Sequence, residues 1–284
     1  MSKASNIMRL ALLQLKGSKD KTANVANALG QIEAAVKQHK PRLITLPECF
    51  NCPYGTKYFR EYSERIPDGY TSQQLSKAAA DHQVYIVGGT IPELGENDAI
   101  YNTCTVWAPN GELIGKHRKM HLFDIDVKGG IRFKESETLS AGNEFTTIDV
   151  DGHRIGIGIC YDIRFEEMAR LYRNAGCEMI IYPAAFNMTT GPLHWELLQR
   201  ARANDNQLYV VTTSPARDSN AEYVAYGHSM IVDPWAKVLK SASEGEEIVV
   251  ADVDFSLVEQ VRQQIPVFNQ RRVDLYSTKQ VPKV

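Results

Sequence analysis

The sequence predicts an α/β protein, a layered sandwich of mixed β-sheets and helices with an internal two-fold repeat. Apolar runs of strand length alternate with segments whose apolar residues recur at helical spacing. Hairpin signals between some of these runs add antiparallel strand pairs. The order of elements in the first half of the chain is then repeated in the second half.

Helical stripes and apolar runs define the first half. Val25, Leu29, Ile32 and Val36 predict a helix that Pro41 ends. Three apolar runs predict buried strands at residues 7–15, 42–46 and 84–87. The other elements expected in this half are a helix over 72–82 and a hairpin over 103–116 with the turn Pro109-Asn110-Gly111.

Residues 123–142 have no clear period and carry mixed charge. We expect them to form a long surface or lid loop, because long structureless loops in compact domains are often functional. Near the end of the chain, 257–264 reads as a last helix, and 266–284, with few apolar residues, reads as an extended tail.

The second half repeats three segments of the first half in the same order. Residues 43–50 (LITLPECF) match 179–186 (MIIYPAAF), 84–92 match 208–215, and 106–116 match 231–240. The opening strand has its counterpart in 153–160. We therefore expect two α/β halves paired face to face, with reactive residues from both halves meeting between them.

The most informative stretch is 154–165 (RIGIGICYDIRF), where isoleucines alternate with Gly156, Gly158 and Cys160. Glycine inside a strand usually marks close approach by another backbone or a ligand. Asp162 is a candidate N-cap for a helix that follows. Cys160 would then lie near the N-terminal dipole of that helix, which lowers a thiol pKa from about 8.5. The alternative is that Cys160 is a small buried hydrophobe, as free cysteine usually is.

Composition excludes several classes of protein. The chain has 284 residues and a net charge of −2, so nothing favours binding to nucleic acid or to an anionic membrane. Its polar start lacks the apolar core of a signal peptide, and no apolar run has transmembrane length. Five cysteines without a secretion signal predict reduced thiols and a cytoplasmic protein.

Three residues at expected strand ends could carry chemistry: Glu48, Lys119 and Cys160. Partial burial after Pro47 would raise the pKa of Glu48 towards that of a general base. For Lys119, which lies in the basic run 116–119, and for Glu48, the alternative is a solvated surface charge. Cys49-x-x-Cys52 could suggest redox chemistry or zinc, but no second cysteine pair follows at zinc spacing, so we expect no metal.

Glu48 in LPECF, Lys119 in HRKMHLFD and Cys160 in GICYDIRF resemble the Glu-Lys-Cys signature of the nitrilase (carbon–nitrogen hydrolase) superfamily. The resemblance runs from the first strand to about Pro266, and residues 182–207 with the ending RQQIPVFNQRR are most similar to the omega-amidase branch. It implies a four-layer α-β-β-α sandwich over residues 1–265 with a tail over 266–284. It also implies a homodimer without cofactor.

The resemblance also implies roles. Glu48 would take the thiol proton of Cys160, which attacks the amide carbonyl and forms a thioester. Lys119, with the backbone N–H of Tyr161, would stabilise the oxyanion. Glu135 matches a second family glutamate that orients Lys119 or the substrate, although from the sequence alone it would pass as a surface charge. Relatives often have Gly where this chain has Ala236, and Pro or Ala where it has Glu166, and neither position should touch the chemistry.

For the substrate, the branch implies a short dicarboxylate monoamide such as 2-oxoglutaramate, 2-oxosuccinamate or succinamate. Candidate donors to its anionic end are Tyr54, Arg164 and Thr189, with Phe186 and Met188 as walls. Arg164 suits bidentate carboxylate binding but equally suits a structural ion pair. The competing functions are an amidase for deaminated glutathione or a carbamoyl amine, and a non-catalytic interaction protein.

Overall fold

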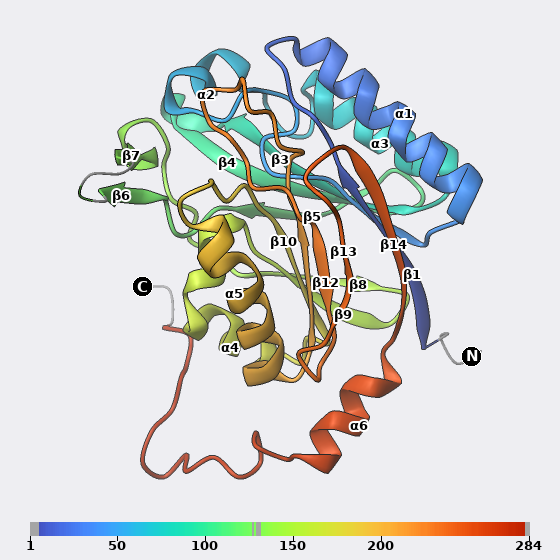
Figure 1. Cartoon of the computed structure of the whole chain (residues 1–284), viewed down its shortest axis with the longest axis vertical. Helices are drawn as coiled ribbons and strands as arrows, with labels where there is room; N and C mark the ends of the chain where they lie inside the picture. The colour runs from blue at the N-terminus through green and yellow to red at the C-terminus, as the bar shows by residue number, and fades with distance from the viewer. Residues whose placement is uncertain (1–5, 127, 129–131, 282–284) are drawn as a thin grey trace.

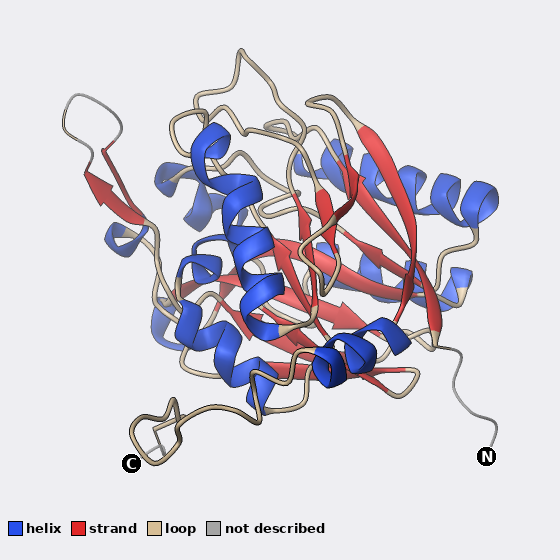
Figure 2. Ribbon diagram, turned by 60° about the horizontal axis from the view of Figure 1, so that its bottom comes forward, coloured by secondary structure: helices blue, strands red, loops and turns tan. Residues whose placement is uncertain are grey.

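The computed structural model describes residues 6–126, 128 and 132–281, which form two six-stranded sheets packed between two pairs of helices (Figures 1 and 2). The first sheet has the order β14 (Glu247–Asp254), β1 (Ile7–Gln14), β2 (Leu43–Thr45), β3 (Tyr85–Leu94), β4 (Ile100–Trp107) and β5 (Leu113–Arg118). The second has the order β13 (Val238–Ser241), β12 (Met230–Val232), β11 (Tyr209–Thr213), β10 (Met179–Pro183), β9 (His153–Ile157) and β8 (Thr146–Val150).

Helices α1 (Lys21–His39) and α3 (Tyr70–His82) cover the first sheet, and α4 (Glu166–Asn174) and α5 (Gly191–Asn206) cover the second (Figure 1). Along β1, alternate side chains face opposite layers. Leu10 and Leu12 belong to the core shared with the second sheet, whereas Ala11 and Leu13 pack with the residues of α1 and α3. The period of two thus builds the predicted four-layer α-β-β-α sandwich.

The predicted internal two-fold is confirmed by the strand pairing. In the first sheet β1, β2 and β3 are parallel, and β4, β5 and β14 pair antiparallel. In the second sheet β9, β10 and β11 are parallel, and β12, β13 and β8 pair antiparallel. Each matched pair of sequence segments occupies the same place in its sheet.

The prediction of a structureless loop over 123–142 is wrong. Strands β6 (Asp124–Asp126) and β7 (Arg132–Lys134) pair as a hairpin that projects from the body, and a 3₁₀ turn at Glu135–Glu137 follows (Figures 1 and 2). Strands of three residues are too short to show a period. Residues 127 and 129–131 of this predicted loop lie outside the described residues. The sequence analysis also missed α2 (Thr56–Tyr62).

After the last helix, α6 (Ser256–Gln264), the chain as far as residue 281 has no regular helix or strand. It packs back on α4, where Arg173 lies over the ring of Phe268 at 4.2 Å and the Asn174 amide donates to the Thr278 carbonyl at 3.2 Å. Residues 1–5 of the predicted domain and 282–284 of the predicted tail lie outside the described residues. Within the described ranges, no helix combines the length and the apolar character needed to span a bilayer.

Glu93 on β3 ties three strands of the first sheet together. Its buried carboxylate accepts two hydrogen bonds from Arg118 at 2.8 Å, one from Lys116 at 3.0 Å and one from Thr103 at 2.7 Å. Although burial opposes ionisation, these donors lower the pKa of Glu93 to about 2. The ionised carboxylate therefore stabilises the fold above the unfolded-state pKa of about 4.5, and the contribution is lost as the pH falls towards 2.

We expect Glu93→Gln to lower the free energy of unfolding by about 3 kcal/mol at pH 7, from a pKa difference of about 2.5 units. Near pH 3 the difference between the variant and the unsubstituted protein should shrink to less than half. Urea unfolding at a series of pH values measures both, with the exposed Glu96→Gln as the control that should change little. A deficit of constant size from pH 7 to pH 3 would contradict this account.

Candidate active site

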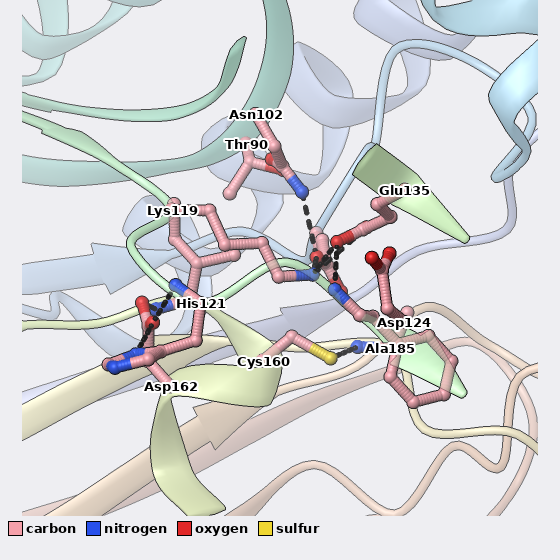
Figure 3. A network of polar contacts seen from close by, with 12 residues as sticks. Thr90, Asn102, Lys119, His121, Asp124, Glu135, Cys160, Asp162 and Ala185 are labelled. Carbon is pink, nitrogen blue, oxygen red and sulfur yellow. Dashed lines mark hydrogen bonds and ion pairs between the residues drawn. The ribbon is translucent and has the colours of Figure 1, made fainter. Parts of the chain in front are cut away.

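Glu48, Lys119 and Cys160 come together where strands of the two sheets end. Glu48 follows β2, Lys119 follows β5, and Cys160 lies three residues beyond β9. Glu135, from the 3₁₀ turn after β7, lies beside Lys119 (Figure 3). All four side chains are buried. Glu135, which from the sequence alone would pass as a surface charge, is buried against Lys119 because the β6–β7 hairpin brings it inward.

Lys119 lies between two carboxylates. Its Nζ is 3.0 Å from Glu48 Oε1, and 3.0 and 2.9 Å from the two oxygens of Glu135. Burial alone would lower the pKa of Lys119, but the two neighbouring negative charges outweigh burial and hold this pKa well above its usual value. The lysine is therefore a buried positive charge held between two carboxylates.

Glu48 has one anchored oxygen and one unbonded oxygen. Oε1 accepts from Lys119 and, at 2.8 Å, from the amide of Asn102 on β4. Oε2 is buried, with no hydrogen-bond partner among the described residues. Burial raises the pKa of Glu48, whereas interaction with the Cys160 thiol, which lies beside it, lowers this pKa. The carboxylate is suited to accept a proton.

Glu135 is held from three sides. Besides Lys119, the hydroxyl of Tyr54 and the backbone N–H of Phe123 each donate to its carboxylate at 2.7 Å. With so many donors, the carboxylate of Glu135 is directed at Lys119 and has little freedom to move.

Cys160 opens a short 3₁₀ helix (Cys160–Arg164) and has φ of +44°, a strained value for a residue with a side chain. Its Sγ accepts a hydrogen bond from the backbone N–H of Ala185 at 3.4 Å (Figure 3). The expected lowering of its pKa by a helix dipole is wrong. Helix α4 begins only at Glu166, and burial, followed by the charge of Glu48, raises the pKa of the thiol well above its usual value. The resting thiol therefore keeps its proton.

Asp162 is not the predicted N-cap of α4. Its buried carboxylate accepts from the backbone N–H groups of Ile159 and His121, both at 2.9 Å. It also lies 2.8 Å from His121 Nδ1 and 3.3 Å from His117 Nε2. Asp162 thus joins the turn that carries Cys160 to the segment that carries Lys119 (Figure 3).

Gly156 in β9 and Gly158 just after it leave space that tyrosine side chains fill. A Cβ at Gly156 would lie 2.7 Å from the ring of Tyr172, and one at Gly158 would lie 2.4 Å from the ring of Tyr182. The expected close neighbour, a backbone or a ligand, is therefore wrong. Two tyrosine rings fill this face of the strand.

A cavity of about 330 Å³ opens beside Glu48. Tyr54 lines it, together with Tyr223, whose ring centroid is 4.4 Å from that of Tyr54. Its remaining walls come from Gly17–Lys19, Cys49, Pro53, Tyr58, Ala185, Pro215, Ala216, Asp218, Asn220–Glu222 and Ala225. Lys19 is the only lysine or arginine among the described residues that line it.

The other predicted substrate contacts are Tyr161, Arg164, Phe186, Met188 and Thr189, and none of them is among the described residues that line this cavity. The Arg164 guanidinium lies 4.9 Å from the centroid of the Phe186 ring and 3.3 Å from His194 Nδ1. Met188 and Thr189 are exposed. Their contact with substrate stays a prediction.

In the described ranges, no three His, Cys, Asp or Glu side chains gather in a way that could hold a metal ion. Cys49 and Cys52 are both buried free thiols.

The chain is similar to known proteins over most of its length. The chain matches the carbon-nitrogen hydrolase family over residues 9–263. The chain belongs to the carbon–nitrogen hydrolase family. Two relatives, from Bos taurus and Homo sapiens, are both named omega-amidase NIT2. The first is 55% identical over 94% of this chain and 96% of its own length, and the second is 54% identical over 95% and 96%. The crystal structure of Saccharomyces cerevisiae Nit3, described as a member of branch 10 of the nitrilase superfamily, superposes with a TM-score of 0.88. The two sequences are 48% identical, and the match covers 96% of this chain and 99% of the Nit3 chain.

The two noted departures of this carbon–nitrogen hydrolase lie away from the cavity-lining residues described above. Ala236 has φ of +59°, a left-handed value that favours glycine, in the turn between β12 and β13. Glu166 begins α4 and accepts hydrogen bonds from Arg170, one turn later, at 2.8 and 3.0 Å. An acidic residue suits the first turn of a helix.

Proposed function

We propose that this carbon–nitrogen hydrolase is an omega-amidase. It would hydrolyse the terminal amide of short dicarboxylate monoamides, such as 2-oxoglutaramate, 2-oxosuccinamate and succinamate, to the dicarboxylate and ammonia. The observation that carries the proposal is that relatives named omega-amidase are 52–55% identical over nearly the whole chain. The buried Glu48, Lys119, Glu135 and Cys160 cluster supplies chemistry that an amidase needs, and a non-catalytic scaffold would have no use for it.

Cys160 is the proposed nucleophile and Glu48 its general base. Since the thiol keeps its proton at rest, attack on the amide carbonyl requires a base at the moment of reaction, and the unbonded Oε2 of Glu48 is suited to take that proton. Glu48 then passes the proton to the departing nitrogen, so that ammonia leaves and a thioester remains. Water activated by Glu48 hydrolyses the thioester and regenerates the thiol.

Lys119 is the proposed stabiliser of the oxyanion, together with the backbone N–H of Tyr161. A buried cation with a raised pKa stays charged throughout the cycle, which supports this role. Glu135 would hold Lys119 in place through the contacts at 3.0 and 2.9 Å. The N–H of Ala185, 3.4 Å from Sγ, would orient the thiol before attack.

The specificity test compares succinamate with propionamide, a neutral amide. We expect kcat/KM to be about 100-fold higher for succinamate, because a cationic site loses a charged hydrogen bond when the ligand is neutral. Ammonia release from the two substrates measures the ratio. If propionamide or an aliphatic nitrile is hydrolysed as efficiently as succinamate, the omega-amidase proposal fails and only membership of the family stands.

Two cations are candidates for the partner of the distal carboxylate, and matched variants separate them. Arg164→Met removes the predicted contact, and Lys19→Met removes the cation that lines the cavity beside Glu48. The variant that removes the true contact should reduce the ratio of kcat/KM for succinamate to kcat/KM for propionamide. It should do so chiefly by lowering kcat/KM for succinamate. If both ratios stay at the wild-type value, the donor is a neutral group, with Tyr54 and Thr189 next to be tested.

We also propose that two copies form a homodimer and work in the cytoplasm. Leu193 and Leu197, one turn apart on α5, are 68% and 61% exposed, and Trp235 is 45% exposed. Arg200 on the same helix donates to the carbonyl of Ala236 at 2.9 Å, so the three apolar side chains lie on neighbouring elements. Such exposed groups support association, which sedimentation velocity tests. The odd number of cysteines suits a reducing compartment.

A further inference from the structure

Asn102 touches two of the three charged residues of the site, Glu48 and Lys119, although its sequence context, a tyrosine before and a threonine after, did not indicate this. Its side chain is buried in β4, and its Nδ2 donates to Glu48 Oε1 at 2.8 Å. Its backbone carbonyl accepts the backbone N–H of Lys119 at 2.8 Å. One residue therefore contacts the side chain of Glu48 and the main chain of Lys119.

The two oxygens of Glu48 differ because of this contact. Oε1 receives two donors, from Asn102 and from Lys119, while Oε2 receives none among the described residues. Rotation of the carboxylate about its Cγ–Cδ bond would break both hydrogen bonds at once. Lys119 alone would permit such a rotation, because Glu135 also bonds its ammonium group and a single point donor does not define the plane of a carboxylate.

We propose that Asn102 is a positioning residue that fixes the plane of the Glu48 carboxylate, so that its unbonded oxygen is presented to the thiol of Cys160. The inference rests on the proposed role of Glu48 as general base. Among the described residues Asn102 has no hydrogen bond to the sulfur of Cys160, and it acts through Glu48.

A purely structural role for Asn102 is the alternative, and the next residue on β4 provides a matched control. Thr103 is also fully buried and donates to a different carboxylate, Glu93 Oε2, at 2.7 Å. Thr103→Val removes a buried hydrogen bond from the same strand without touching Glu48. Asn102→Leu removes the donor to Glu48 and keeps similar volume.

The experiment follows alkylation of Cys160 by iodoacetamide against pH, with the modified residue identified by mass spectrometry, and needs no amide substrate. With one donor fewer, the carboxylate of Glu48 is less stabilised, so the acid limb of the profile in Asn102→Leu should move to higher pH by about one unit. With succinamate, kcat should fall about 10- to 100-fold while KM changes less than about threefold. Thr103→Val should keep the wild-type profile.

If Asn102→Leu and Thr103→Val give the same alkylation profile and the same kcat, Asn102 is structural and the proposal is overturned. Should the leucine variant not fold, Asn102→Asp keeps the shape and places a second carboxyl beside Glu48. It should shift the acid limb in the same direction and further, because like charges oppose ionisation. A folded aspartate variant with the wild-type profile would also overturn the proposal.

The alkylation assay separates this inference from the proposed function. If the wild-type protein does not release ammonia from succinamate, the omega-amidase proposal fails. The effect of Asn102→Leu on the pH profile of Cys160 would still support the positioning role.

Discussion

Cys160→Ala is expected to abolish amide hydrolysis, with kcat falling by at least about 10⁴-fold, because removing a nucleophile leaves only binding and oxyanion stabilisation. The fold should persist, since among the described residues the sulfur accepts one hydrogen bond, from the Ala185 N–H, and alanine retains the Cβ. Ammonia release from succinamate measures the first effect, and thermal unfolding measures the second.

The controls for this variant are the two other thiols near the site. Cys49 and Cys52 are buried free thiols, and among the described residues no hydrogen bond joins either of them to Lys119 or Glu135, so Cys49→Ala and Cys52→Ala should keep most activity. A double variant that is folded yet inactive would show that the nucleophile has been assigned wrongly or that the cysteine pair takes part.

Glu48→Gln is expected to block formation of the thioester, with an effect of about 10²- to 10⁴-fold, the range for a positioned general base. Glutamine keeps the shape, and its amide oxygen can still accept from Asn102 and Lys119, but it cannot take the proton of the Cys160 thiol. Rapid-quench mass spectrometry with succinamate measures the rate at which the acyl-enzyme appears.

The matched control is Glu93→Gln, which makes the same change at another buried glutamate of the same sheet. It should reduce stability and leave the rate of acylation near that of the wild type. If the Glu48 variant accumulates acyl-enzyme at the wild-type rate, Glu48 acts only in the later hydrolysis, and the assignment of the first proton transfer is wrong.

Local pattern was enough to predict most of the fold. The apolar runs 7–15 and 42–46 each correspond to a strand, and the three repeated segments correspond to equivalent strands of two sheets. The β6–β7 hairpin and α2 were missed, because a three-residue strand or a two-turn helix contains too few residues for a period to appear.

The site was predictable only where a residue follows a recognisable strand, as Glu48 and Cys160 do. The side chains that hold the site in place come from elsewhere in the chain. Asn102 reaches Glu48 from a strand 54 residues later, and Asp162 contacts His121 across 41 residues. The pKa of Cys160 was predicted in the wrong direction because burial, which depends on the whole fold, outweighs the end of a helix.

The internal two-fold bears on the origin of this chain and on where it can be divided into two fragments. In the repeated segments, Glu48 is equivalent to Ala184, and Cys49 to Ala185. The duplicated scaffold therefore carries unlike groups at matching positions: the first half supplies the carboxylates and the ammonium, and the second half supplies the thiol and the N–H beside it. If the halves descend from a self-associating ancestor, its two sites have been merged into one asymmetric site. Cutting the gene between β8 and β9 would yield two fragments that are inert apart and active only when reassembled.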